Sequence, residues 1–128
     1  MEKLDLYKCD ICGNLVEVIL NGSGELVCCG QPMKKMEAQT QEIAMMEKHV
    51  PIIVTLDDGT KEIRVGEVLH PMLPEHYIMF IQTVSKDKKY SYLKFLNPGE
   101  VPKMLLKAPE DDFIAREYCS IHGLWESK

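Results

Sequence analysis

The chain has 128 residues, of which 45% are hydrophobic and 27% charged, and its formal net charge at pH 7 is −5. These proportions are ordinary for a small globular protein. The acidic balance gives no indication of nucleic-acid binding, and no apolar run approaches the roughly 20 residues that span a bilayer. The segment Met1–Asp5 lacks the basic and apolar pattern of a signal peptide, so a cytoplasmic location is expected. In that reducing compartment, clustered cysteines are more often metal ligands than disulfides.

Residues 1–36 form a short segment that is rich in turns and contains four of the five cysteines. Leu15–Leu20 and Glu25–Cys28 are predicted strands, joined by the turn Asn21-Gly22-Ser23-Gly24. A unit of this size buries too little apolar surface to fold unaided, so a bound metal would supply much of its stability. The polar residues 37–41 are predicted to be a linker to a second domain, residues 42–128.

The second domain is predicted to be an antiparallel β-sandwich of immunoglobulin-like type, which makes the protein all-β. Its first hairpin is predicted from Val50–Leu56 and Lys61–Val65, which flank the turn Asp57-Asp58-Gly59-Thr60. Turn-like breaks separate four further predicted strands: His76–Val84, Tyr90–Leu96, Val101–Lys107 and Phe113–Cys119. The sequence contains no convincing long amphipathic helix.

The first set of candidate metal ligands is Cys9-x2-Cys12 followed by the adjacent pair Cys28-Cys29. Four thiolates form a closed tetrahedral site, and the spacing alone favours structural zinc. Side chains of neighbouring residues tend to diverge, however, so binding one ion through both Cys28 and Cys29 should distort the tetrahedron. A distorted site is more typical of redox iron. Zinc remains the alternative occupant.

The second set comprises all four histidines and the remaining cysteine: His49, His70, His76, Cys119 and His122. Any single histidine is more often an ordinary surface or core residue, but the five residues together indicate a metal site. Five such ligands are too many for a tetrahedral structural ion, and they suit a redox metal that takes five or six. An octahedral iron would keep one open position for a small substrate, and the thiolate could donate electron density toward it.

A copper site of the cupredoxin type is the alternative, which would make the protein a non-enzymatic electron carrier. Tyr118-Cys119-Ser120-x-His122 resembles the copper loop of these β-sandwich proteins, which use two histidines, one cysteine and usually a nearby methionine. Residues 123–127 contain no methionine, and two of the four histidines would be left without a role.

Together these motifs resemble a known family over the entire chain. The Cys-x2-Cys and Cys-Cys unit is similar to desulforedoxin. Glu47-Lys48-His49-Val50-Pro51, His70-Pro71-Met72, His76 and Cys119-x2-His122-Gly123 are similar to neelaredoxin. Joined in this order they resemble desulfoferrodoxin, the two-iron superoxide reductase; Tyr77 stands where relatives often carry tryptophan. The resemblance implies a one-electron reduction of superoxide to hydrogen peroxide, electrons from rubredoxin, and a homodimer in anaerobic or microaerophilic prokaryotes.

Carried over to this sequence, the resemblance implies two iron ions per chain. The first would be held as a tetrathiolate by Cys9, Cys12, Cys28 and Cys29. The second would be held in a plane by His49, His70, His76 and His122, with Cys119 axial and the sixth position open to superoxide. Lys48 would attract the anion despite the acidic surface and could orient water for protonating the product. Glu47 would ligate the ferric ion after turnover; for both residues a solvated strand end is the alternative.

Overall fold

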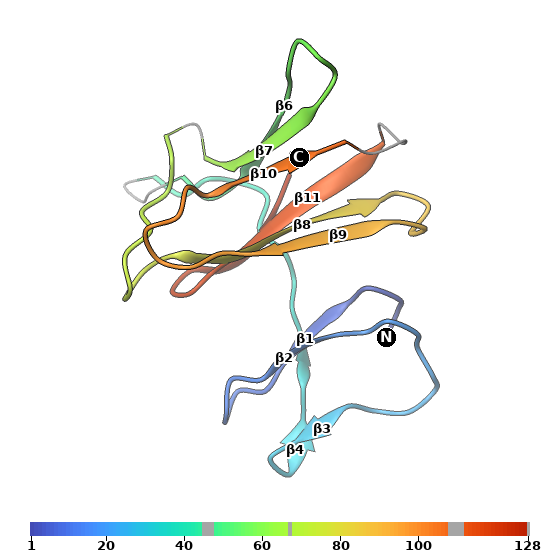
Figure 1. Ribbon diagram of the computed structural model, residues 1–128. Helices are drawn as coiled ribbons and strands as arrows, with labels where there is room; N and C mark the ends of the chain where they lie inside the picture. Colours follow the sequence, from blue (N-terminus) through green and yellow to red (C-terminus); the bar gives the residue numbers. More distant parts are fainter. Residues whose placement is uncertain (45–47, 67, 108–111, 128) are drawn as a thin grey trace. The chain divides into compact units, whose positions relative to one another are not determined.

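The computed structural model describes residues 1–44, 48–66, 68–107 and 112–127. The chain divides into two compact units, Met1–Glu37 and Ala38–Lys128. Within the described ranges every regular element is a β-strand (Figure 1), and no helix there could span a membrane. The prediction of an all-β protein is therefore confirmed.

The unit Met1–Glu37 consists of a three-stranded antiparallel sheet and a separate small hairpin. The sheet contains β2 (Leu15–Glu17), β1 (Leu6–Lys8) and β5 (Lys34–Lys35), in that order. The hairpin pairs β3 (Val27–Cys28) with β4 (Gln31–Pro32). The buried apolar side chains of this unit are few: Leu4, Leu6, Cys9 and Val18. So small a core agrees with the expectation that a metal contributes to its stability.

The pairing in this unit differs from the predicted one. The predicted strands over residues 15–20 and 25–28 do not pair with each other; the first pairs with β1 and the second with β4. The reason lies in the hydrogen bonds beyond the end of β2. Leu4 N donates to Val18 O (2.6 Å) and Val18 N donates to Asp5 O (2.9 Å). The β1 side therefore satisfies the backbone at Val18, and the chain from residue 19 onward leaves the sheet.

The unit Ala38–Lys128 is a sandwich of two antiparallel sheets. The first sheet contains, in order, β10 (Lys103–Leu106), β7 (Lys61–Val65) and β6 (Pro51–Thr55). The second contains β12 (Gly123–Glu126), β11 (Phe113–Cys119), β8 (Ile78–Ser85) and β9 (Ser91–Phe95). All six strands predicted for this domain are present, with somewhat different ends, and the predicted sandwich is confirmed. The strand β12 was not predicted.

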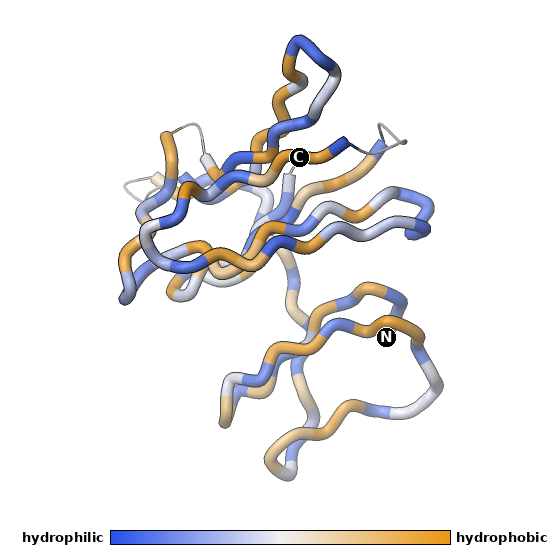
Figure 2. The backbone as a smooth tube through the Cα atoms, in the orientation of Figure 1, coloured by the Kyte–Doolittle hydropathy of each residue, from blue (hydrophilic) through white to orange (hydrophobic). Residues whose placement is uncertain are grey.

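Apolar side chains from both sheets form one core. Its buried members are Ile63, Val65, Ile78, Ile81, Leu96, Met104, Leu106, Phe113, Ala115 and Cys119. Figure 2 shows hydrophilic residues at the turns that join β6 to β7 and β8 to β9. Because Cys119 is a member of this core and is fully buried, the residue at the end of β11 is held by packing before any ligand is considered.

The turn between β6 and β7 has the geometry that its sequence predicts. Leu56 N donates to Thr60 O (2.8 Å), and Gly59 takes a positive φ of 86°, which glycine adopts without steric cost. The Asp58 carboxylate accepts a hydrogen bond from Thr60 N (3.0 Å). This bond from the Thr60 amide is the main reason why the pKa of Asp58 is lowered.

Candidate metal centres

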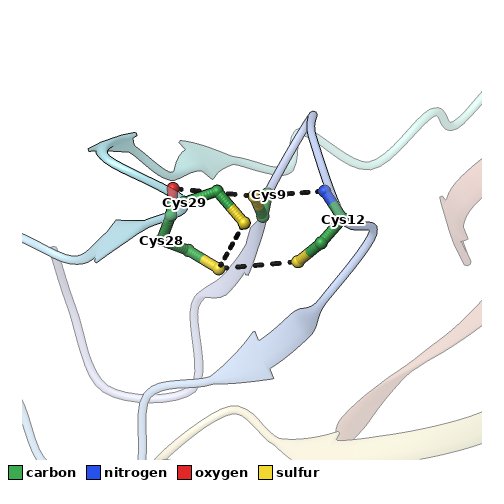
Figure 3. A group of neighbouring side chains, drawn as sticks. All are labelled: Cys9, Cys12, Cys28 and Cys29. Atoms are coloured by element: carbon green, nitrogen blue, oxygen red, sulfur yellow. Dashed lines mark hydrogen bonds between the residues drawn. The ribbon is translucent and has the colours of Figure 1, made fainter.

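The four cysteines of the unit Met1–Glu37 point toward one another (Figure 3). Their sulfur atoms all lie within 4.8 Å of each other. The Sγ atoms of Cys12 and Cys28 are 3.5 Å apart, and those of Cys28 and Cys29 are 3.9 Å apart. Four sulfurs bound at about 2.3 Å to a tetrahedral ion are separated by about 3.8 Å. The spacing therefore fits a single metal ion.

A tight turn presents the first two thiols. Gly13 N donates to Cys9 O (2.9 Å), and Gly13 takes a φ of +84°. The same turn directs the Cys12 amide at the Cys9 sulfur, with an N···Sγ distance of 3.5 Å. An amide that points at a sulfur stabilises its thiolate form.

The adjacent pair Cys28-Cys29 converges because of an unusual backbone conformation. Cys28 pairs with Gln31, so Cys29 and Gly30 form the two-residue loop of the β3–β4 hairpin. Both loop residues have positive φ, 54° for Cys29 and 78° for Gly30. A type I′ hairpin turn requires this sign at both positions. The left-handed conformation of Cys29 allows neighbouring side chains, which normally diverge, to face the same point; the strain lies in the backbone.

The thiols of this cluster differ in pKa. The pKa of Cys9 is lowered to about 6, chiefly by the hydrogen bond from the Cys12 amide. The pKa of Cys29 is raised to about 12, chiefly by its interaction with the Cys12 side chain. One sulfur thus begins as a thiolate, while others must lose protons when a metal binds. Metal uptake at this site is therefore expected to release protons.

The second cluster lies in the unit Ala38–Lys128 and forms a closed ring of four imidazoles. Going around the ring, the centroid separations are 4.7 Å for His49–His70, 4.7 Å for His70–His76, 5.1 Å for His76–His122 and 4.9 Å for His122–His49. The interplanar angles of these pairs, 59°, 89°, 77° and 80°, make each ring steeply inclined to its neighbours. Four edges thus face a common centre.

The distances between donor atoms fit one ion in a square arrangement. His49 Nε2 lies 3.1 Å from His70 Nε2 and 3.2 Å from His122 Nδ1. Two nitrogens bound at about 2.1 Å and at right angles are separated by about 3.0 Å. The Cys119 sulfur lies 3.6 Å from His70 Nε2 and 3.9 Å from His122 Nδ1, which suits a longer metal–sulfur bond to the same ion.

All five donors come from one end of the sandwich. His49 lies two residues before β6, while His70 and His76 lie in the connection between β7 and β8. Cys119 ends β11, and His122 lies in the turn to β12. Reciprocal hydrogen bonds of 3.0 Å between the backbones of Leu73 and His76 tighten the connection between β7 and β8.

The orientation of His70 is fixed by its own neighbour. The Nδ1 atom of His70 lies 2.7 Å from Pro71 O, and a carbonyl oxygen can only accept. Nδ1 must therefore carry the proton, which leaves Nε2 as a lone-pair donor toward the centre of the ring. Metal-binding histidines are oriented in this way in many proteins. His70 is also 3% exposed, so its ring has little freedom to turn.

Lys48 is half-buried beside the ring, next to His49. Its backbone rests against Gly66, where an added Cβ would come within 2.7 Å of Lys48 Cβ and 2.8 Å of Lys48 O. The Gly66 amide donates to Val50 O (3.2 Å), and its φ is +79°. Only glycine can lie this close to the backbone of Lys48. Gly66 therefore helps to fix the position of the segment that carries Lys48 and His49. The other predicted residue, Glu47, lies outside the described residues.

Several residues around this ring were not predicted from the sequence. Trp125 stacks on His49, and Gln39 and Glu42 donate or accept hydrogen bonds next to ligand positions.

Glu117 is fully buried two residues before Cys119, and neither carboxylate oxygen has a hydrogen-bond partner in the described part of the chain. Burial, and then the nearby charge of Glu42, raises the pKa of Glu117 well above its usual range. The sequence does contain a sign of this burial. Glu117 alternates with Phe113 and Ala115 along β11, so it lies on the same face of the strand as these two buried residues.

Comparison with known proteins agrees with this arrangement. The family model described as "Desulfoferrodoxin, N-terminal domain" matches residues 1–36, and the one described as "Desulfoferrodoxin" matches residues 41–128. The desulfoferrodoxin of Desulfarculus baarsii is 47% identical over 127 residues, which cover 99% of this chain and 98% of that protein. The chain belongs to the desulfoferrodoxin family. The resemblance inferred from the cysteine and histidine motifs is thereby confirmed.

Two further relatives bear on the second unit and on the fold. The superoxide reductase of Thermococcus kodakarensis is 32% identical over 98 residues, which cover 64% of this chain and 85% of that protein. The crystal structure of the superoxide reductase from Treponema pallidum has a TM-score of 0.71 and covers 100% of both chains. Its sequence identity is 24%, so this likeness concerns the fold alone.

The copper alternative does not agree with the family or with the ring. A cupredoxin site uses two imidazoles, whereas all four histidine rings of this chain meet at one centre. The two donor sets of this chain, one with four thiols and one with four imidazoles and a thiol, each suit iron.

Proposed function

We propose that this protein is a superoxide reductase, which reduces superoxide by one electron to hydrogen peroxide at an iron held by His49, His70, His76, His122 and Cys119. The observation that carries the proposal is the ring of four imidazoles with the Cys119 sulfur 3.6 Å from one of its donor atoms. The name and 32% identity of the Thermococcus kodakarensis relative support it. The reaction consumes one superoxide, one electron and two protons for each hydrogen peroxide.

A ferrous ion held by these residues would supply the electron, and an external donor would then restore the ferrous state. His49, His70, His76, His122 and Cys119 would hold the ion, and an iron that takes six ligands would have room for one small anion besides them. The buried Cys119 thiolate would donate electron density to the ion.

Lys48 is proposed to attract superoxide, because the net charge of −5 otherwise repels an anion. The ammonium group can also hold a water molecule that delivers a proton to the product. Glu47 is proposed to ligate the ferric ion after turnover, as the family resemblance implies.

The four cysteines Cys9, Cys12, Cys28 and Cys29 are proposed to hold a second iron as a tetrathiolate, which serves in electron transfer. Residues 1–36 would form this domain, 37–41 the linker and 42–128 the reductase domain. The donor is proposed to be a rubredoxin-like protein, the assembly a homodimer, and the compartment the cytoplasm. An acidic, cysteine-rich chain that reduces an oxygen radical suits a reducing compartment.

Metal analysis combined with pulse radiolysis tests the proposal. Purified protein is expected to hold two irons per chain and, when reduced, to consume pulsed superoxide with formation of one hydrogen peroxide per superoxide. A dismutase would instead give half as much peroxide, together with dioxygen. One or no iron, or an intense blue copper band, would contradict the assignment.

A further inference from the structure

We propose that Gln39 and Glu42 are positioning residues for the histidine ring: they hold His122 and His49, which precede strands of different sheets, at the separation that one metal ion requires. The inference rests on the proposed iron site. It concerns residues that were predicted to be linker, or to lie next to it, and that do not touch the metal position themselves. Both belong to the unit Ala38–Lys128.

Glu42 holds the backbone that carries His49. One carboxylate oxygen accepts a hydrogen bond from His49 N (2.8 Å), and the other accepts one from Val50 N (3.0 Å). These two amides lie just before β6, which is an edge strand. The Glu42 carboxylate therefore fixes the position of this backbone firmly, because each hydrogen bond to a charged acceptor is stronger than one between neutral groups.

Gln39 holds the turn that carries His122. Its side-chain Nε2 donates to His122 O (3.0 Å), and the same oxygen accepts the Trp125 Nε1 hydrogen at 3.1 Å. The backbone of Gln39 also pairs with β12, since Gln39 N donates to Leu124 O (3.0 Å) and Glu126 N donates to Gln39 O (2.9 Å). Gln39 therefore extends the second sheet by a parallel bridge. A flexible linker would have none of these bonds.

The two contacts matter because, among the described residues, no strand pairing joins the parts that they connect. His49 precedes β6, an edge strand of the three-stranded sheet, whereas His122 precedes β12, an edge strand of the four-stranded sheet. Their donor nitrogens must nevertheless stay 3.2 Å apart. The chain from Gln39 to Glu42 runs from one sheet edge to the other, with a side-chain bond at each end. We infer that it sets the distance between the two ligands.

Two conservative variants and one control test this inference. Glu42→Gln keeps the shape but turns one acceptor into a donor, which faces an amide hydrogen. Gln39→Leu keeps the size and removes the bond to His122 O. The control is Gln41→Ala, an exposed residue between them. The readouts are the thiolate-to-ferric absorption band, the rate at which a chelator removes the second iron, and amide hydrogen exchange at His49 and Val50.

Both variants are expected to shift the absorption band and to release the second iron about tenfold faster or more, the range seen when outer residues of metal sites are changed. In Glu42→Gln, exchange at His49 and Val50 should rise while exchange at the core residue Ile63 stays unchanged, which separates local loosening from general instability. The tetrathiolate spectrum is the internal control and should not change. Gln41→Ala should match the unmodified protein.

The inference is overturned if both variants keep the band position and the rate of iron release of the unmodified protein. It is also overturned if exchange at Ile63 rises as much as exchange at His49, because the residues would then support the whole domain rather than the ligand. These results differ from a failure of the proposed function, in which the unmodified chain itself would hold no iron at the histidine ring.

Discussion

The imidazole of His49 lies flat against the indole of Trp125, with ring centroids 4.6 Å apart and an interplanar angle of 11°. The indole nitrogen also donates to His122 O. A single fully buried side chain thus restrains two members of the histidine ring, one by stacking and one through its backbone. Tryptophan is well suited to this double role because it offers a large flat surface together with one donor.

Trp125→Leu is expected to lower the free energy of unfolding by about 3 kcal/mol, since it leaves a cavity and removes one of the two hydrogen bonds that His122 O accepts. The ferric absorption band should shift as well, because His49 loses its stacking partner. Trp125→Phe keeps an aromatic ring but lacks the donor. Its unfolding free energy and band position should lie between those of the unmodified protein and those of Trp125→Leu. Urea unfolding and a visible spectrum of each variant measure these effects. A Leu variant with an unshifted band would show that the stacking does not orient His49.

Cys119→Ser should abolish the thiolate-to-ferric charge-transfer band, because a hydroxyl replaces the sulfur that is placed beside the imidazole donors. The tetrathiolate absorption should remain, since its four cysteines lie in the other unit. Spectra of the oxidised protein before and after substitution make the measurement. If the band persists unchanged, Cys119 is not a ligand.

Cys12→Ser should remove the tetrathiolate iron and leave most of the reaction with superoxide. The physical reason is that the two donor sets lie in separate compact units, Met1–Glu37 and Ala38–Lys128. Iron analysis and pulse radiolysis on the same sample test both parts. A rate that falls by orders of magnitude while the second iron stays bound would mean that the two centres depend on each other.

Lys48→Ile should slow the encounter with superoxide by about tenfold and flatten its dependence on ionic strength. Exposed charges are screened over about 10 Å at 0.1 M salt, so the salt slope reports the local charge. Lys48→Arg is the matched control, and it should retain most of the rate and the slope. A Lys48→Ile protein with unmodified rate and slope would assign this lysine to the ordinary solvated surface.

Glu47→Ala, in contrast, should leave the encounter rate nearly unchanged, because the carboxylate is proposed to act only on the ferric product. The ferric spectrum should change, and added azide or cyanide should bind more readily. Titration of the oxidised protein with either anion provides the measurement. Unchanged spectrum and anion affinity would contradict the proposed ligation.

Asp58→Asn should change stability in a pH-dependent way. The pKa of Asp58 is lowered in the fold, mainly by the Thr60 amide, so its contribution is present above its ordinary value of 3.8 and is lost as pH falls through the lower folded value. The difference in unfolding free energy between the unmodified protein and the variant should therefore be constant near neutrality and shrink below about pH 4. Urea unfolding over that range tests this, with the exposed neighbour Asp57→Asn as control. A difference that does not shrink on acidification would contradict it.

The candidate donor residues could be predicted from the sequence because cysteine and histidine have distinctive metal-binding chemistry, even where they lie far apart in the chain. The Asp58-Gly59 hairpin could be predicted because it depends on a few consecutive residues. Which imidazoles would be neighbours around the ring could not be predicted. Their order depends on the contact between the β7–β8 connection, which carries His70 and His76, and the turn before β12, which carries His122.

Other features could not be predicted, for equally specific reasons. The bonds that Gln39 makes to β12 and to His122 O depend on residues more than 80 positions away, so the composition of the segment 37–41 does not indicate them. The strand β12, Gly123–Glu126, was not predicted because four residues are too few to show the alternation that identifies a strand. The short strand Leu6–Lys8 has too few residues to show alternation, so the actual partner of Leu15–Glu17 was not recognised.

The distance along the chain between the ligands has a thermodynamic consequence. His49 and His122 are 73 positions apart, and an ion bound to both closes that loop. By the relation used for disulfide cross-links, closing a loop of this length removes chain entropy from the unfolded state equivalent to about 4 kcal/mol. Much of the marginal stability of a domain this small would then depend on iron. When iron is scarce, the reductase domain should unfold more often and be degraded faster, so that the amount of protein in the cell follows the supply of its metal.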